Sequence, residues 1–202
     1  MLAAASALIG GWFFCEFVGY FLHILLHSER IPYLSRSHMI HHLKVYNPKQ
    51  GLRQGGSYKG SAQDRTSVLG FGLEWVAPIA FIMIVTALGF WLLQIAIVYY
   101  FIFTLSAILW GYFLFGYMHD AMHLKEFWME RVPFLRDWFY SIRKLHDIHH
   151  LEFSNDGRML KNYGICFFFF DRLFVSLSPK HKLFNQDGFT ASMKRYDKII
   201  NY

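Results

Sequence analysis

The feature that most constrains this chain is the stretch from Val68 to Met118, which contains no lysine or arginine and one acid, Glu74. A helix needs about 20 apolar residues to cross a membrane, so this stretch is long enough for two helices that fold back on each other. We predict these spans at residues 68–88 and 90–118. The turn between them is predicted near Gly89, because glycine interrupts the apolar run there.

An earlier tract, residues 2–26, is apolar except for Glu16 and His23 and is long enough to be a third span. It lacks the basic start and the small-residue cleavage site of a signal peptide, so we expect it to be retained. A carboxylate inside a span is costly and marks a functional candidate. Glu16 is therefore expected to line a substrate channel, to hydrogen-bond to a metal ligand, or to play a protonated structural role.

The composition agrees with a membrane protein. Of the 202 residues, 54% are hydrophobic and 20% aromatic, while only 17% are charged, against roughly 25% in average globular proteins. A soluble domain of this size could not bury so much apolar surface, and a disordered chain would be richer in charge. With only Cys15 and Cys166, a disulfide scaffold is excluded. We expect one domain over 1–202, an all-α integral membrane helical bundle.

The distribution of basic residues predicts the orientation. All 20 lysines and arginines lie between residues 28 and 67 or after residue 118. Three spans would place both segments on one side, which the positive-inside rule assigns to the cytoplasm, with the N-terminus outside. The net charge of +6 is then a topology signal. We expect a multi-pass membrane protein that binds no nucleic acid, since no soluble module carries the charge.

The remaining segments are polar or mixed and should form a helical cytoplasmic cap. Residues 44–66 are rich in Gly, Gln, Ser and Lys and predict a loop. Residues 125–160 should be mainly helical, broken at Pro133. The apolar element at about 163–177 is too short to span and is predicted to be interfacial or re-entrant.

Ten of the eleven histidines fall in four motifs that read HILLH, HMIHH, HDAMH and HDIHH. Residues three or four apart share one side of a helix, so we expect each motif to direct its imidazoles at one point. All four motifs should meet at the membrane–cytosol boundary. Ten ligands are too many for one ion and suit two, at about five each, and imidazole suits Fe, Zn, Cu and Ni. The candidate ligands are His23, His27, His38, His41, His42, His119, His123, His146, His149 and His150.

Other interpretations of these histidines remain open. A single buried histidine is usually a hydrogen-bonded core residue, and His181 is expected to be of that kind or a surface residue. A histidine-rich surface could sense pH. A membrane metal transporter or sensor is the main non-enzyme alternative, although transporter sites usually lie near the bilayer midplane. Two b-type haems would use only four histidines.

The motifs resemble those of the fatty acid hydroxylase superfamily, which includes sterol desaturases and C4-methyl sterol oxidases. HILLH, ten residues and HMIHH are similar to its first two histidine boxes, and GYMHDAMH is similar to the third box of fatty acid 2-hydroxylases. HDIHH and NYGICFFFFDRLFVSL resemble the closing box and its NYG…WDRLFGT-like signature. Here Phe170 replaces Trp, and Val175-Ser176 replaces Gly-Thr. Small carotenoid hydroxylases share the order of the boxes.

The resemblance implies a membrane di-iron enzyme that uses O2 to hydroxylate a lipid or fatty-acyl C–H bond. Carotenoid-ring hydroxylation and lipid or sterol desaturation on the same site are the enzymatic alternatives. The cofactor would be two Fe ions, with Zn as an inactive substitute in purified protein. No flavin, haem or ferredoxin motif is present, so electrons should come from a separate cytochrome b5-like or ferredoxin-like donor.

Further candidates would support the ligands or contact the substrate. A ligating imidazole donates its other N–H to a carboxylate or carbonyl, which makes Asp120, Asp147 and Asp171 candidates besides Glu16. Asn162, at the start of the closing signature, is also a candidate. Four aromatic residues before the third box could wall an acyl pocket, although lipid-facing or packing roles are the default. They are Tyr112, Phe113, Phe115 and Tyr117.

Overall fold

The computed structural model describes residues 1–48, 52, 67–68, 71–72 and 75–201. The loop predicted at 44–66 lies mostly outside these residues. The described chain is largely helical, and its one two-stranded sheet is the antiparallel pair β1 (Ser67–Val68) and β2 (Phe71–Gly72). The prediction of a helical protein is confirmed.

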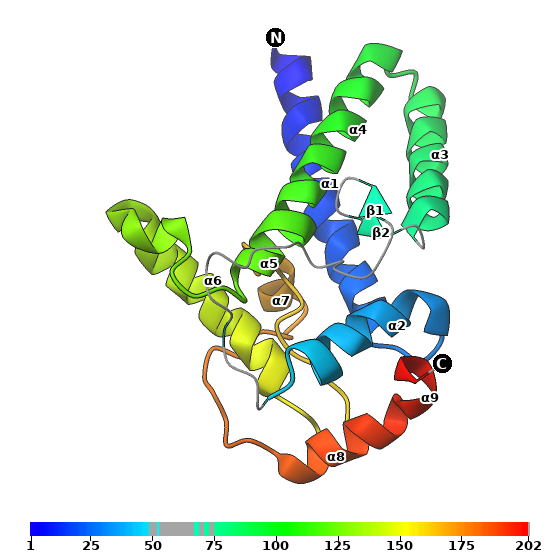
Figure 1. Ribbon diagram of the computed structural model, residues 1–202. Coiled ribbons are helices and arrows are strands. Elements are labelled where there is room, and N and C mark those ends of the chain that lie inside the picture. Colours follow the sequence, from blue (N-terminus) through cyan, green and yellow to red (C-terminus); the bar gives the residue numbers. More distant parts are fainter. Residues whose placement is uncertain (49–51, 53–66, 69–70, 73–74, 202) are drawn as a thin grey trace.

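The helices α1 (Leu2–Leu26) and α4 (Ile97–Gly111) pack along each other and form the centre of the upper, apolar part of the molecule (Figure 1). They approach so closely that a Cβ atom on Gly11 would lie 2.4 Å from the carbonyl oxygen of Phe103. Nearby, the Ser106 hydroxyl donates a hydrogen bond to the Leu8 carbonyl at 2.7 Å. Small and hydroxyl-bearing residues at a crossing are typical of helices that pack within a membrane.

Two helices in the described part of the chain are long and apolar enough to cross a membrane. One is α1. The other, Ile97–Ala121, continues α4 through the π-helix η4 (Tyr112–Met118) and the short α5 (His119–Ala121). Both correspond to predicted spans, although the second begins at Ile97 and not at residue 90.

The helix α3 (Val76–Leu92) is apolar but has only 17 residues, and it packs beside α4. Its sequence was predicted to span over 68–88, but the β1–β2 pair takes up the first residues. The turn predicted near Gly89 is wrong, because Gly89 lies inside α3 with open space around it and the apolar helix runs on. The chain turns after Leu92, where Gln94 adopts a left-handed conformation with φ 54°.

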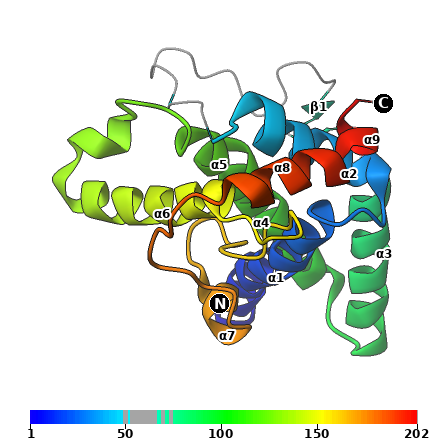
Figure 2. The same cartoon turned by 90° about the horizontal axis from the view of Figure 1, so that it is seen from below.

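The cap lies below the apolar helices and consists of α2 (Pro32–Ile40), η1 (His41–Val45), η5 (Trp128–Arg131), α6 (Pro133–Leu151), α8 (Gln186–Arg195) and α9 (Asp197–Ile200) (Figures 1 and 2). The short helix α7 (Phe169–Leu173) packs on α1. Pro32 and Pro133 each occupy the first helical position, where a missing N–H is harmless. The predicted break at Pro133 is therefore a helix start. The helical prediction is wrong beyond Leu151, because Gly157 turns the chain at φ 79° and Phe153 bridges to Met159.

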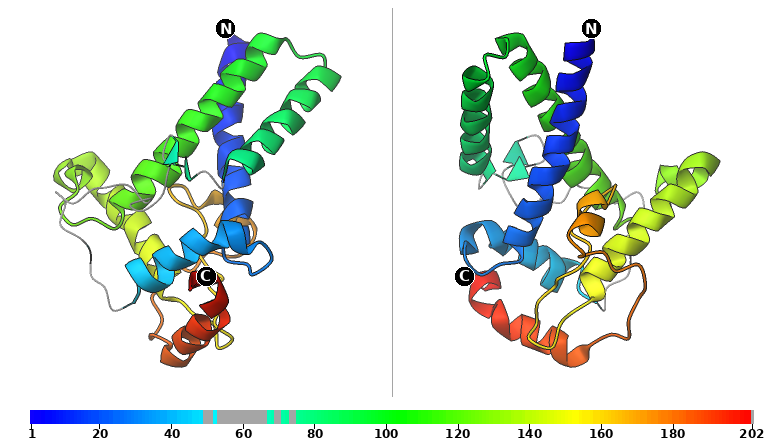
Figure 3. Two further views of the ribbon diagram at one scale, coloured as in Figure 1. Left: turned by 45° about the vertical axis from the view of Figure 1, so that its right-hand side comes forward. Right: turned by 180° about the vertical axis from the view of Figure 1, so that it is seen from behind.

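The C-terminal helices close the cap from below. Figure 3 shows α8 and α9 passing under α2. Tyr196, only 1% exposed, packs in a cluster with Met39 and Ile200, and its hydroxyl donates to the carbonyl of His27 at 2.6 Å. The end of α1 is thereby fixed to the last helices of the chain.

Candidate metal centre

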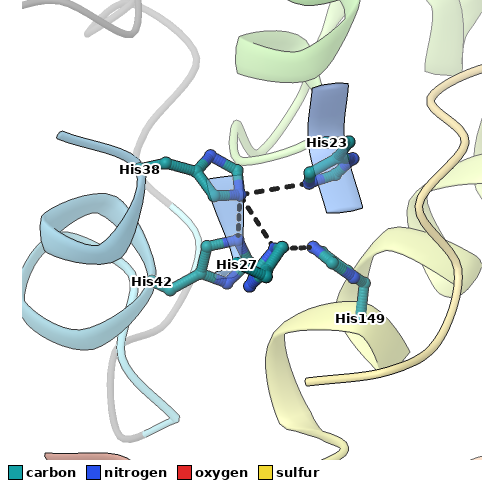
Figure 4. A group of neighbouring side chains, drawn as sticks. All are labelled: His23, His27, His38, His42 and His149. Carbon is teal, nitrogen blue, oxygen red and sulfur yellow. Dashed lines mark hydrogen bonds between the residues drawn. The ribbon is translucent and has the colours of Figure 1, made fainter. Parts of the chain in front are cut away.

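The ten motif histidines gather in two groups of five. Within each group the potential ligand nitrogens all lie within 4.8 Å of one another. Group one, drawn in Figure 4, contains His23, His27, His38, His42 and His149. Group two contains His41, His119, His123, His146 and His150. All ten side chains are buried except that of His38, which is partly buried. The predicted division of ten histidines into two sets of five matches this arrangement.

We predict from the sequence that each HxxHH motif directs its imidazoles at one point, and for both of these motifs the prediction is wrong. In HMIHH, His38 and His42 join group one while His41 joins group two, and in HDIHH the middle histidine, His149, likewise leaves its neighbours. Positions i+3 and i+4 lie about 100° apart around a helix, which is enough to direct them to opposite sides of the i position. Each motif therefore contributes to both groups and lies between them.

π-helical turns adjoin both groups. One, η1, begins at His41, and the other, η4, ends immediately before His119. A π-helical turn contains an extra residue and rotates the side chains that follow, and such turns occur frequently at functional sites. The apolar and histidine periodicity of the sequence gives no sign of these turns.

The spacing of the nitrogens fits metal coordination. In group one, four pairs of Nε2 atoms lie 2.9–3.1 Å apart, joining His38 to three neighbours and His27 to His149 (Figure 4). In group two, His123 Nε2 lies 3.1 Å from His41 Nε2 and 3.0 Å from His146 Nε2. Two nitrogens bound at right angles to one ion, each at about 2.1 Å, would lie about 3.0 Å apart.

The partners of the other ring nitrogens support the same conclusion. Nδ1 donates to a backbone carbonyl in His23 (Tyr163 oxygen, 2.5 Å) and in His149 (Lys161 oxygen, 2.6 Å). A neutral imidazole that donates through Nδ1 carries a lone pair on Nε2. Each of these lone pairs faces the nitrogen of another histidine at about 3 Å. Lone pairs at this distance repel each other, and a cation bound between them would remove the repulsion. The residues present therefore fit a bound metal in each group.

The cap histidines are held in the neutral form that binds metals. Burial, together with the nearby His119, lowers the pKa of His150 to about 3, against the raising effect of its hydrogen bond to Tyr46. Burial, with the charges of neighbouring imidazoles, also holds the pKa of His42 and His146 well below its ordinary value. Protons therefore do not compete with a metal at neutral pH.

Two of the predicted supporting residues organise the segment that carries these carbonyls. The Asp171 carboxylate accepts hydrogen bonds from the backbone N–H groups of Tyr163 (2.8 Å) and Gly164 (2.7 Å). The Asn162 amide donates to the Leu145 carbonyl at 2.9 Å and accepts from the Ser178 N–H at 2.7 Å. Neither side chain bonds to a histidine. The groups that accept from His23 and His149 are backbone carbonyls, which have no signature in a sequence.

Among the other three predicted acids, Asp120 is the one whose carboxylate lies beside a clustered histidine. Glu16 accepts a hydrogen bond from the indole N–H of Trp110 at 3.2 Å. One Asp120 oxygen lies 3.6 Å from Nδ1 of His119, and the other is buried without a hydrogen-bond partner among the described residues. Burial raises the pKa of Asp147 to about 6, against the lowering effect of Arg143.

An apolar cavity of about 500 Å³ leads from the helices to the histidines. Its walls are residues of α1, α3 and α4, including Phe14, Val18, Ile79, Met83 and Ile108. At one end it reaches two histidines of each group, His23, His38, His41 and His119. Among the four aromatic residues predicted as a pocket wall, Phe115 lines this cavity. Glu16 is not among its lining residues.

Comparison with known proteins agrees with the motifs and the geometry. No curated protein and no solved structure matches the chain. A protein-family model described as fatty acid hydroxylase matches residues 8–176, a range that holds most of α1, all of α4 and all ten clustered histidines. The chain therefore belongs to the fatty acid hydroxylase family, whose members are membrane-associated oxidoreductases of the hydroxylase and desaturase type.

Proposed function

We propose that this protein is a membrane-bound di-iron oxygenase that hydroxylates a lipid or fatty-acyl C–H bond with O2 and external electrons. The observation that carries the proposal is the apolar cavity that ends at both histidine groups. Its volume of about 500 Å³ lies within the range of about 300–1,000 Å³ typical of ligand pockets. A hydrocarbon chain in this cavity would bring one of its C–H bonds to the two groups together.

The ten histidines would hold the two ions, five in each group. When bound, iron supplies the redox chemistry that O2 activation requires, which zinc cannot supply. The walls supplied by α1, α3 and α4 would orient the chain and exclude water from the reacting carbon. The carbonyls of Lys161 and Tyr163 keep their histidine partners neutral and fixed in orientation.

The reducing equivalents would come from a separate protein. We infer a cytochrome b5-like or ferredoxin-like donor, because the sequence has no cofactor-binding motif of its own. With the N-terminus outside, the cap and its basic residues would face the cytoplasm, where positive charge attracts an acidic donor.

A metal transporter is less well supported by the same geometry. The histidines lie at the lower ends of α1 and of the helix Ile97–Ala121 and in the cap, and not at mid-span. The cavity that reaches them is lined mainly by apolar side chains, which give a hydrated ion no partners in transit.

The first test is metal content per chain on anaerobically purified protein, with Mössbauer spectroscopy. We expect close to two irons in a coupled pair. A single tightly held ion, or labile zinc that iron cannot replace, would favour a transporter or sensor.

The second test is the product. The protein in lipid vesicles is supplied with O2 and a reducing system, and the lipids are analysed by mass spectrometry. A gain of one oxygen indicates hydroxylation, and a loss of two hydrogens indicates desaturation. Carotenoid added to the vesicles separates ring hydroxylation from acyl hydroxylation.

A further inference from the structure

The segment 167–175, here named the apolar loop, exposes an unusual amount of apolar surface. Phe167, Phe169, Leu173 and Phe174 are each about half exposed, and Val175 is 81% exposed. The only exposed charge among these residues is that of Arg172. Contiguous exposed apolar surface of this kind marks a contact with a partner or a membrane.

The inner side of the apolar loop packs on α1, and this contact distinguishes a membrane contact from a contact with a partner protein. Ring centroids lie 5.8 Å apart for Phe13 and Phe169, and 5.4 Å apart for Phe21 and Phe174. In the right-hand view of Figure 3, α7 lies between α1 and α6. The loop therefore runs along the side of a helix that is long and apolar enough to cross a membrane.

The contact with Phe13 also gives the depth of the loop. Phe13 precedes His23 by ten residues, which is about 15 Å along a helix. It lies next to the midpoint of Leu2–Leu26, and the hydrocarbon layer of a bilayer is about 30 Å thick. On the neighbouring side, Phe167 stacks on Trp110, nine residues before His119 at the lower end of Ile97–Ala121. Both helices therefore place the start of the loop near the middle of the span.

We propose that the apolar loop is a re-entrant membrane element that enters the hydrocarbon of the leaflet beside the cap. Phe167 and Phe169 reach toward the bilayer midplane, and Leu173, Phe174 and Val175 lie nearer the headgroups. The Arg172 side chain extends toward the headgroups, as basic side chains do at membrane interfaces. The partner of the exposed face is lipid hydrocarbon.

The hydrogen bonding of the loop fits this environment. Non-helical backbone is tolerated at membrane depth only when its polar groups are satisfied internally. The Asp171 side chain accepts the N–H groups of Tyr163 and Gly164, and its carbonyl accepts those of Ser176 (2.9 Å) and Leu177 (3.1 Å). The Ser176 hydroxyl donates to the same carboxylate at 2.7 Å. One buried acid thus satisfies backbone groups of the residues that flank the loop on both sides.

The test uses the wild-type protein in phosphatidylcholine vesicles that contain an acyl-chain diazirine photolabel. After irradiation, adducts are mapped by mass spectrometry. We expect adducts in 167–175 at a yield comparable to that on Phe101, Leu105 and Leu109, the exposed side chains of α4. Leu183, 98% exposed in the cap, is the matched apolar control and should remain unlabelled. Labelling of 167–175 no stronger than that of Leu183 would overturn the proposal.

A second measurement compares nitroxides at Leu173→Cys and Leu183→Cys. The Leu173 label should be accessible to O2 and protected from a water-soluble nickel chelate, and the Leu183 label should show the reverse. Spin–spin broadening at Leu173 in dilute vesicles would instead mean that a second copy covers the loop, and it would refute the lipid contact. Neither measurement needs turnover, so both outcomes are independent of the proposed reaction. Photolabelling of the exposed α4 side chains separately tests whether α4 lies in the membrane.

Discussion

A single ligand residue provides the sharpest test of the two histidine groups. His149 is 1% exposed, its Nδ1 donates to Lys161, and its Nε2 lies 3.1 Å from that of His27. We expect His149→Ala to lose about one metal ion per chain and to lower turnover at least about 100-fold, because removing a ligand should exceed the effect of losing its supporting partner. Metal content and product formation measure the two effects.

The matched control is His181→Ala. His181 is exposed and belongs to neither group, so its replacement should leave metal content and turnover unchanged. Retention of both metal ions in His149→Ala, or loss of metal in His181→Ala, would contradict the assignment of ligands.

Backbone strain at Val175 gives a second prediction at this scale. Val175 has φ 59°, a conformation that a β-branched residue rarely adopts, at the position where the related signature has glycine. Val175→Gly should relieve the strain and stabilise the protein by about 1 kcal/mol, or about 2–4 °C in melting temperature. Thermal unfolding in detergent measures the shift. Val132→Gly, at φ −99°, should destabilise, and a stabilised control would refute the explanation.

At the scale of elements, Asp171 connects the apolar loop to group one. Its carboxylate fixes the N–H groups of Tyr163 and Gly164, and the Tyr163 carbonyl accepts from His23. Asp171→Asn turns an amide N–H toward one of these donors and should lower the metal affinity of group one about 10–100-fold. Metal titration of the purified variant measures the change.

Group two should keep its affinity in Asp171→Asn, since its histidines do not contact this segment in the described hydrogen bonds. Asp187→Asn, an exposed acid in the first turn of α8, is the control and should bind metal as the wild type does. An equal loss of affinity in both groups would indicate general unfolding and not a positioning role.

The junction between η5 and α6 predicts a pH dependence. Glu130 Oε1 lies 2.6 Å from Arg143 Nη2. Burial raises the pKa of Glu130, but the hydrogen bond and charge of Arg143, with hydrogen bonds from the Phe127 N–H and the Tyr140 hydroxyl, outweigh it, and the pKa is below its ordinary value. A carboxyl whose pKa is lower in the folded protein than in the unfolded chain stabilises the fold. Its full contribution is present above the unfolded pKa of about 4.3, and it is lost as the pH falls through the pKa of the folded protein.

We therefore expect Glu130→Gln to be less stable than the wild type at neutral pH and to approach it in acid. Denaturant unfolding between about pH 7 and about pH 3 measures the difference. Glu126→Gln, at an exposed neighbouring position, is the control, and its free energy of unfolding should differ from that of the wild type by the same amount over this range. A Glu130→Gln difference that does not narrow in acid would contradict the ion-pair argument.

The extent of the apolar elements shows what a sequence can predict here. Residues 2–26 were predicted and observed as one helix, because length and hydropathy alone determine such a segment. The limits of α3 and α4 were not predictable, since the apolar run continues through the turn at Gln94. The π-helical turns η1 and η4, beside the histidines, have no counterpart in the apolar or histidine pattern of the sequence.

The metal centre also has features that the sequence predicts and features that it does not. The number and identity of the gathered histidines could be read from motif spacing, because i, i+3 and i+4 positions share a helix side. The sequence could not assign His41 and His149 to their groups, since this depends on where the neighbouring helices lie. It also favoured carboxylates such as Asp171 as partners of the imidazoles, while backbone carbonyls take that place.

For the whole molecule, the two groups join segments that are distant in sequence. His27 and His149, in group one, are 122 residues apart, and His41 and His123, in group two, are 82 apart. The two ions together would cross-link α1, α2, α5 and α6. Apolar packing also fixes the cap, through the cluster around Tyr196 and through a second cluster that joins Phe139 and Ile142 of α6 to Met118 of η4, and the ions would add to this packing.

Removal of metal should accordingly destabilise the cap more than the apolar helices. Ligand linkage at about 1,000 times the dissociation constant is worth about 4 kcal/mol for each ion, so chelation of both ions should lower the melting temperature by about 20 °C. We expect hydrogen exchange to accelerate in α2 and α6 while α1 and α4 stay protected at mid-span. Iron should restore the wild-type melting temperature, and His149→Ala should show a smaller shift because it has already lost one ion. An unchanged melting temperature after complete metal removal would mean that the imidazoles are held by the fold alone, and the cross-linking role would be wrong.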